Sequence, residues 1–210
     1  MNYLAHIALS GSNPEIIMGN FSGDFIKGRL DSPTKVSLPK NFIAGVRLHR
    51  FIDNFTDTDE TVREMTKELC HTYGRAAAIA TDIYFDHFLA KDFSKYHGVD
   101  LRSFVSGFYD ISTHHSHLIV PAFRPLAEAL ISNDWLFRYR EWITVERTLI
   151  SMGKRYPFLA ELLNSSNETK RNLLVYEEYF VDFYPRLQNA VALKLIVPAE
   201  NSSQTKGNVF

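Results

Sequence analysis

Apolar residues recur every three or four positions along most of this chain, the spacing that places them on one face of an α-helix. No convincing run alternates apolar and polar residues in the way a half-buried strand does. The pattern therefore predicts an all-α protein. Helices are expected over residues 3–9, 14–27, 39–55, 57–73, 75–90, 100–117, 125–132, 135–152, 157–163 and 168–195.

These helices are expected to form a single domain, because neither an internal repeat nor a linker interrupts them. The domain spans residues 1–197, and residues 198–210, which lack an apolar face, are expected to form a flexible tail. Residues 31–40 contain two prolines and predict a loop between helices. The expected fold is a compact helical domain with one core.

Local signals set several of the expected helix ends. Asp57 and Glu60 have the spacing of a capping box and predict a helix start. Asp100 is a second candidate N-cap. Pro185 predicts a bend in the last helix, and residues 135–152 fit either one helix or two pieces.

Composition narrows the class of protein. The chain has 210 residues, 45% of them hydrophobic and 22% charged, which suits one globular domain with a real core. A formal net charge of −1 argues against a chain-wide basic surface for nucleic acid. No membrane span or signal peptide is recognisable, and the single Cys70 excludes an internal disulfide. We expect a soluble cytoplasmic protein, with its oligomeric state left open.

Two polar pairs interrupt otherwise apolar helical stretches. His49 and Asp53 form the first, and Asp82 and Asp86, followed at once by His87, form the second. The spacing of i to i+4 puts both members of a pair on one helix face, and in both cases that face is apolar and points inward. Because burying uncompensated carboxylates is costly, such groups should be hydrogen-bonded, ion-paired or bound to a metal. Several carboxylates and imidazoles in an apolar shell favour a divalent metal ion.

Six short segments together form a recognisable series of motifs. In chain order they are NYLAH at 2–6, GNFSGDFIKG at 19–28, AGVRLHRFIDNFTD at 44–57, DIYFDHFLA at 82–90, DWLFRYR at 134–140 and DFYPRL at 182–187. With them the chain resembles the acyl-carrier-protein phosphodiesterases, the holo-carrier-protein hydrolases. That family is described as an all-helical, manganese-dependent and divergent relative of the His-Asp metal phosphohydrolases. The adjacent His-Asp dyad of the parent superfamily is replaced here by Asp86-His87 in reversed order.

The resemblance implies roles for particular residues. The implied metal ligands are Asp24, His49, Asp53, Asp86 and His87, and the implied catalytic residues are Arg50 as a phosphate clamp, Asp82 as the partner that orients a ligand histidine, and His6. We expect His49, Asp53, Asp86 and Asp24 to lie within one coordination sphere or one water bridge. Other readings stay open: Asp24 as a helix cap, Arg50 in an ion pair, and His6 as a hydrogen-bonded core histidine.

The implied reaction is hydrolysis of the phosphodiester that joins 4′-phosphopantetheine to a serine of holo-acyl carrier protein. Its anionic phosphodiester repels hydroxide, and a divalent ion both neutralises that charge and lowers the pKa of a bound water. Imidazole and carboxylate ligands suit manganese, iron or zinc, and the resemblance favours Mn²⁺. The products would be apo-carrier protein and 4′-phosphopantetheine.

Two other function classes are compatible with the residues. One is a metal-dependent phosphoesterase for a nucleotide or another small phosphodiester, and the other is a non-catalytic helical binding module. A protein substrate needs a docking surface, and the acidity of carrier proteins points to basic residues, first Arg138 and Arg140, then Arg147, Lys154 and Arg155. The histidines at 114, 115 and 117 are a compositional cluster outside the matched segments.

Overall fold

The structure is a computed structural model that describes residues 1–32, 37–167 and 170–196. Within these ranges every regular element is helical, which confirms the all-α prediction. The elements are α1 (Tyr3–Ala8), α2 (Pro14–Phe21), η1 (Gly23–Phe25), α3 (Lys40–Thr58), α4 (Glu60–Tyr73), η3 (Gly74–Ala76), α5 (Ala77–Lys91), α6 (Phe93–His97), α7 (Leu101–His114), η4 (Ser116–Leu118), α8 (Arg124–Ser132), α9 (Trp135–Arg138), α10 (Trp142–Arg155), η5 (Pro157–Asn167) and α11 (Lys170–Ile196).

Helix ends differ from the predictions where a local hydrogen bond decides them. Asp57 does not cap a helix, because α3 continues through it to Thr58. The N-cap of α4 is Asp59, whose side chain accepts a hydrogen bond from the Val62 amide. Asp100 does cap α7, as predicted, through the Ser103 amide.

Three further helical segments can be compared with the predictions. The helix expected over residues 14–27 ends at Phe21, and η1 continues it as a single tight turn. Residues 135–152 form two pieces, α9 and α10. Helix α11 continues through Pro185 as one element. The tail predicted for residues 198–210 and the middle of the predicted loop at 31–40 lie outside the described residues.

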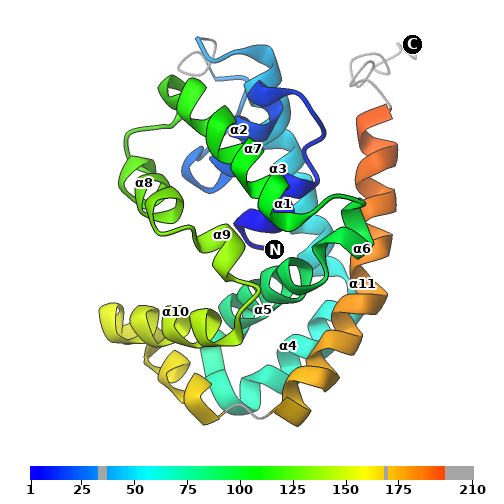
Figure 1. Ribbon diagram of the computed structural model, residues 1–210, viewed down its shortest axis with the longest axis vertical. Coiled ribbons are helices and arrows are strands. Elements are labelled where there is room, and N and C mark those ends of the chain that lie inside the picture. Colours follow the sequence, from blue (N-terminus) through cyan, green and yellow to red (C-terminus); the bar gives the residue numbers. More distant parts are fainter. Residues whose placement is uncertain (33–36, 168–169, 197–210) are drawn as a thin grey trace, which may run out of the picture.

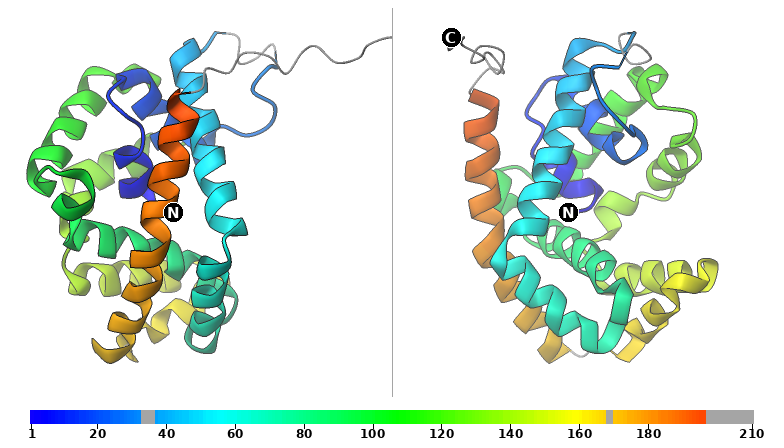
Figure 2. Two further views of the ribbon diagram at one scale, coloured as in Figure 1. Left: turned by 90° about the vertical axis from the view of Figure 1, so that its right-hand side faces the viewer. Right: turned by 180° about the vertical axis from the view of Figure 1, so that it is seen from behind.

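The helices are arranged in two groups that α11 joins (Figure 1). Helices α1, α2, α3, α7 and α8 lie together at one end, and α4, α5, α10 and η5 lie at the other. The long α11 runs along the side of the molecule and contacts α3, α4 and α5 (Figure 2). The short α1 lies at the junction of the groups, against α2 and α5.

The α2–α3 contact is unusually close because two glycines face it. A Cβ atom on Gly19 would collide with the carbonyl group of Phe42, and one on Gly45 would collide with the carbonyl oxygen of Ile16. Without side chains at these two positions the backbones approach closely. The carbonyl groups and side chains of α2 therefore reach the polar face of α3.

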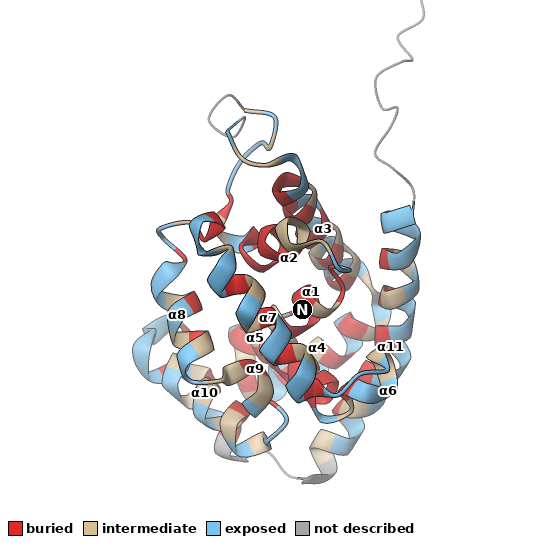
Figure 3. Cartoon of the chain, turned by 45° about the horizontal axis from the view of Figure 1, so that its top comes forward, coloured by how far each residue is buried: buried red, intermediate tan, exposed pale blue. Residues whose placement is uncertain are grey.

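Buried residues line the inward faces of all the longer helices (Figure 3). Helix α1 is enclosed, with Leu4, Ala5, His6 and Ile7 all buried. Helix α5 is buried along most of its length, including Asp86 and His87. No helix in the described ranges is both long and apolar enough to cross a membrane. Helices α1 and α5, which bury His6 and Asp86, are in direct contact.

Candidate metal centre

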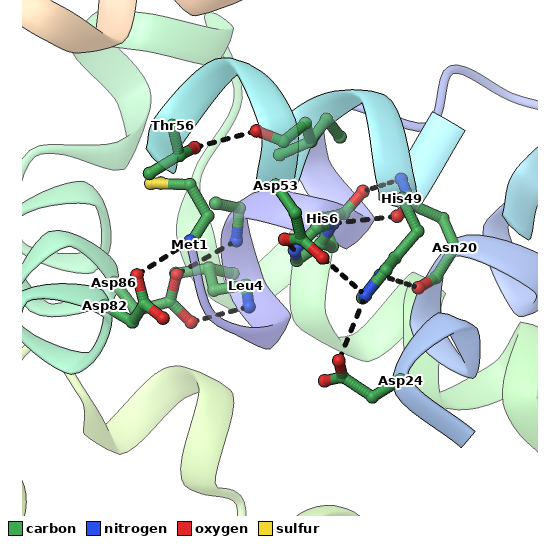
Figure 4. A network of polar contacts seen from close by, with 12 residues as sticks. Met1, Leu4, His6, Asn20, Asp24, His49, Asp53, Thr56, Asp82 and Asp86 are labelled. Carbon is green, nitrogen blue, oxygen red and sulfur yellow. Dashed lines mark hydrogen bonds and ion pairs between the residues drawn. The ribbon is translucent and has the colours of Figure 1, made fainter. Parts of the chain in front are cut away.

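Three polar side chains converge where α1 meets α3 (Figure 4). The Nε2 atom of His6 lies 3.1 Å from Oδ1 of Asp53, and Nε2 of His49 lies 3.1 Å from Oδ2 of the same carboxylate. The two imidazole rings stack with their centres 4.0 Å apart. One ligand atom from each of the three residues lies within 4.8 Å of the others, close enough for one ion to bind all three.

The backbone and side chain of Asn20, on α2, fix the orientation of both imidazoles. Its Oδ1 atom lies 2.8 Å from Nδ1 of His6, and its backbone oxygen lies 2.8 Å from Nδ1 of His49. The amide nitrogen of Asn20 donates to the His6 carbonyl and to Ser10 Oγ, so its oxygen must be the atom that faces the His6 ring. Oxygens of this kind only accept, so both rings carry a proton on Nδ1.

This arrangement leaves both Nε2 atoms facing the Asp53 carboxylate. In a neutral imidazole protonated at Nδ1, Nε2 presents a lone pair, which a carboxylate oxygen repels unless a proton or a cation lies between them. Burial lowers the pKa of His6, which favours its neutral form. Burial by itself also lowers the pKa of His49, but hydrogen bonds with Asp24 and Asp53 outweigh it and raise the pKa to about 9.

The carboxylates of the cluster stay ionised for the complementary reason. Burial raises the pKa of Asp53, but contacts with His49 and His6 outweigh it and hold the pKa well below its ordinary value. The hydrogen bond with His49 lowers the pKa of Asp24. In the metal-free protein the Nε2 of neutral His6 presents a lone pair, whereas the Nε2 of charged His49 carries a proton that a metal ion would displace. Two ionised carboxylates beside these two nitrogens match the ligand preferences of a divalent first-row metal, and an Nδ1–H bonded to oxygen is the usual outer contact of a ligand histidine. The residues present therefore fit such an ion.

Asp24 lies on the open side of the cluster. Its Oδ1 atom is 3.3 Å from Nε2 of His49, and its side chain is 59% exposed. Gly23 allows this approach, because a Cβ atom there would overlap the His49 ring. The next turn of chain is held by Arg50, whose guanidinium donates to the carbonyl oxygens of Ile26 and Gly28 at 2.9 and 2.8 Å. Arg50 therefore fixes the segment after Asp24, and its contacts differ from those of the predicted phosphate clamp.

The structure places Asp86 apart from this cluster, against the first turn of α1. Its Oδ2 accepts from the Leu4 amide at 2.7 Å and its Oδ1 from the Ala5 amide at 3.2 Å (Figure 4). The α1 N-cap residue makes no side-chain capping bond, so Asp86 supplies the cap from α5. Burial raises the pKa of Asp86 to about 7. The expected convergence thus includes His49, Asp53 and Asp24, and the fourth expected member, Asp86, holds a helix end.

The remaining candidates on α5 also have local partners. Asp82 pairs with the Met1 ammonium at 2.8 Å. His87 is buried, and its Nδ1 lies 2.7 Å from the Tyr139 carbonyl oxygen, so that this ring nitrogen donates. Burial lowers the pKa of His87. Neither residue belongs to the group of possible metal-binding side chains found in the described part of the chain. Their predicted roles as orienting partner and ligand have no geometric support here.

The two arginines predicted to bind a partner have different surroundings. Arg138 is exposed and lines an open groove on α9 and α10. Arg140 forms an ion pair with Glu141 at 3.2 Å, and its guanidinium lies 4.1 Å from the centre of the Phe137 ring. Of the two, Arg138 is therefore the one whose guanidinium is not engaged in an ion pair within the described residues.

Sequence reasoning missed the two residues that support the histidines. Asn20 and Ser10 have no charge, so the search for ionisable side chains passed over them. Asn20 does lie in the segment GNFSGDFIKG, on which part of the family resemblance rests. The signal available in the sequence was an amide that directly follows Gly19 in an otherwise apolar helical stretch, and the structure buries that amide.

Comparisons with known proteins agree with one another. The family described as acyl carrier protein phosphodiesterase matches residues 1–187. A relative from Serratia proteamaculans is 31% identical over 188 residues, which cover 89% of this chain and 95% of the relative. One from Salmonella agona is 30% identical over 205 residues, 93% and 100% of the two chains. Both are named acyl carrier protein phosphodiesterase. No solved structure shows a significant match.

A third relative of the same name, from Photorhabdus laumondii, is 28% identical over 186 residues, which cover 88% of this chain and 92% of the relative. The matches include the α1, α2, α3 and α5 segments that build the cluster and cap its first helix. The chain belongs to the acyl carrier protein phosphodiesterase family.

Proposed function

We propose that this protein hydrolyses the phosphodiester between 4′-phosphopantetheine and a serine of holo-acyl carrier protein, with a divalent metal ion bound at the histidine–aspartate cluster. Family membership supports the substrate. The observation that supports the metal is the pair of Nε2 atoms facing one carboxylate while both Nδ1 atoms donate to Asn20. Release of the prosthetic arm would leave apo-carrier protein.

His6, His49 and Asp53 would hold the ion, and Asp24 would add a donor from the exposed side. When bound, a divalent ion supplies charge neutralisation for the phosphodiester and lowers the pKa of a coordinated water. Mn²⁺ is the proposed metal, with Fe²⁺ and Zn²⁺ compatible with the same ligands. The stacked rings and the Asn20 contacts fix the imidazoles before any ligand arrives, so little reorganisation is needed on binding.

The open side of the cluster is where the substrate would approach. Asp24 is more exposed than Asp53, and both histidines are buried behind them. Tyr3 lies beside this opening, and burial, together with the negative charge of Asp24, raises the pKa of its phenol well above the ordinary value. A tyrosine phenol is protonated at neutral pH, so Tyr3 offers a hydrogen-bond donor to an anionic substrate.

One assay tests the reaction directly. The protein is incubated with holo-acyl carrier protein and Mn²⁺, and the intact mass of the carrier protein is followed. The expected result is loss of the prosthetic group, with 4′-phosphopantetheine released and no loss when the metal is chelated. The proposal fails if the carrier protein keeps its arm with Mn²⁺, Fe²⁺ and Zn²⁺ alike.

A binding measurement tests the metal separately from turnover. Titration of Mn²⁺ into the chelator-treated protein should give one site, observed by calorimetry or by the paramagnetic relaxation of water. His49→Ala should remove that site, whereas the exposed His114→Ala should leave it intact. Equal binding by both variants would place the ion elsewhere.

A further inference from the structure

An open groove of about 500 Å³ adjoins the first turn of α1, the helix that carries His6. Its walls come from the start of α1, from α5, and from α9 and α10 (Figure 1). None of the proposed metal-binding residues lines it, so the groove is a separate feature. Its volume falls within the range of about 300–1,000 Å³ that is typical of ligand pockets.

The groove has an apolar floor. The floor residues are Ile79, Ile83, Leu126, Trp135 and Met152. All five are buried or half-buried, with part of their surface left open to the groove. A cleft lined in this way favours a partner that inserts an apolar side chain, because burying apolar surface drives association.

The rim carries an excess of positive charge. Arg138, Arg147 and Arg155 are exposed and line the groove, and none of them forms an ion pair with any residue in the described ranges. The one acidic residue of the lining is Asp82, which already pairs with the Met1 ammonium. In a chain with a formal net charge of −1, three unpaired arginines around one apolar cleft form a local anion-attracting surface.

The groove leads to the cluster along α1. Tyr3 lines the groove, and His6 lies three residues further along the same helix. A rise of about 1.5 Å per residue separates their backbones by less than one helical turn along the axis. A partner seated in the groove would therefore lie against the helix that carries His6.

We propose that this groove docks an acidic, amphipathic helix of the protein substrate, with its carboxylates against Arg138, Arg147 and Arg155 and one apolar side chain on the floor. Charge complementarity selects an acidic partner, and a cleft between helices suits a helix laid along it. This inference rests on the proposed function, since it takes the carrier protein as the substrate. It replaces Arg140 of the predicted docking pair by Arg147 and Arg155.

The test compares two substrates and two double variants. Arg138→Glu with Arg147→Glu reverses two rim charges. The matched control is Lys67→Glu with Lys95→Glu, which makes the same change in net charge at exposed residues of α4 and α6 outside the groove. Each variant is assayed for kcat/KM on holo-carrier protein and on a small nitrophenyl phosphodiester, at low and at high salt, after thermal melts establish folding.

At low salt the rim variant should have a kcat/KM on holo-carrier protein that is lower than wild type by about tenfold or more, because rim charges act on the rate of association. Its kcat/KM on the small ester should stay within about twofold of wild type. High salt should reduce the difference from wild type. Equal losses in the control variant, or equal losses on both substrates, would overturn the docking role. Loss on both substrates would point instead to the reacting arm as the occupant of the groove.

Binding of the carrier protein, measured by fluorescence anisotropy without turnover, separates this inference from the proposed function. If wild type binds the carrier protein and the rim variant does not, the groove docks it even where no arm is released. If wild type releases the arm and the rim variant binds and turns over equally well, the docking site lies elsewhere.

Discussion

Helices α3 and α5 each carry an inward pair of polar side chains spaced by four residues, yet the two pairs face different chemical groups. Asp53 faces two imidazole nitrogens that lack protons unless the ring is charged. Asp86 faces two backbone N–H groups at the start of α1. The first carboxylate pairs with the charged ring of His49 and faces the neutral ring of His6, whereas the second accepts from two backbone amides.

The comparison shows why an inward carboxylate is not by itself a metal ligand. A buried acid is stabilised by whichever donors the fold brings to it, and the free end of a helix supplies N–H groups as readily as an ion supplies charge. Both pairs serve one site, because the helix that Asp86 caps is the helix that carries His6. One pair would hold the ion and the other would hold a ligand in place.

The largest expected difference between the pairs is in metal binding. Asp53→Ala should reduce Mn²⁺-dependent kcat/KM on holo-carrier protein by more than about 100-fold, since even outer partners of metal ligands cost about 10- to 100-fold when removed. Titration of the metal into the variant should show the site lost or greatly weakened.

Asp82→Asn provides the control on α5, since it changes a carboxylate of the other i to i+4 pair without altering a residue of the cluster. It should keep the wild-type affinity for Mn²⁺. A loss of affinity as large as that of Asp53→Ala would erase the distinction between the pairs.

Removing the support of the histidines should have the next largest effect. Asn20→Ala leaves the Nδ1 of His6 without its acceptor, and we expect about 10- to 100-fold weaker metal binding or turnover. Ser10→Ala is the matched control, because it removes a neighbour of the Asn20 amide but leaves the oxygen that faces the ring. The two variants are compared by Mn²⁺ titration, and equal affinities would contradict the orienting role of Asn20.

Asp86→Ala should act mainly on stability. It leaves the buried Leu4 and Ala5 amides without acceptors, at a cost of about 1–3 kcal/mol of the free energy of unfolding, measured by urea denaturation. Metal binding should weaken only as far as α1 shifts. Asp86→Asn, which keeps one acceptor oxygen, should cost less than the alanine variant, and an unchanged free energy of unfolding in both would remove the capping role.

The smallest expected effect is a difference in pH dependence of the metal-free protein. His49 has a pKa of about 9 in the folded state, above its ordinary 6.5, so its contribution to stability is present below pH 6.5 and is lost as pH rises through 9. Asp86 has a pKa of about 7, above its ordinary 3.8, so the folded state keeps a proton and loses stability as pH rises from about 4 to 7.

The free energy of unfolding, measured in chelator between pH 4 and 9.5, separates the two windows. His49→Gln should flatten the decline above pH 6.5, and Asp86→Asn should flatten the one below pH 7, each relative to wild type. If each variant flattened the other's pH range, or if neither changed the pH profile of the free energy of unfolding, the two groups would not titrate in the ranges given above.

The sequence alone predicts the helices and the buried positions of His49 and Asp86, because spacing along one helix decides which face a side chain occupies. Asp82, which was also predicted to point inward, is 41% exposed. His49 and Asp53 needed no other element to be placed side by side. The all-α fold follows equally from local periodicity. These features depend on neighbours within a turn of the chain.

What faces each pair could not be read from the chain, since it depends on elements far away. The partner of Asp86 is a helix end about eighty residues earlier, and the close approach of α2 to α3 depends on Gly19 and Gly45 meeting backbone carbonyls. The shift of the cap from Asp57 to Asp59 has a similar cause, because Asp59 also pairs with Arg186 of α11. Tertiary contacts thus decided between local alternatives.

The dependence of α1 on Asp86 has a consequence for the order of events during synthesis. His6, Asn20, Asp24, His49 and Asp53 all belong to the first 53 residues of the chain and leave the ribosome before α5 does. Helix α1 has only six residues, too few to be stable alone, and its cap arrives with Asp86. The nascent chain therefore carries every proposed ligand before the residue that caps the helix of His6 has been made, and the proposed metal site would reach its full affinity only after α5 packs against α1.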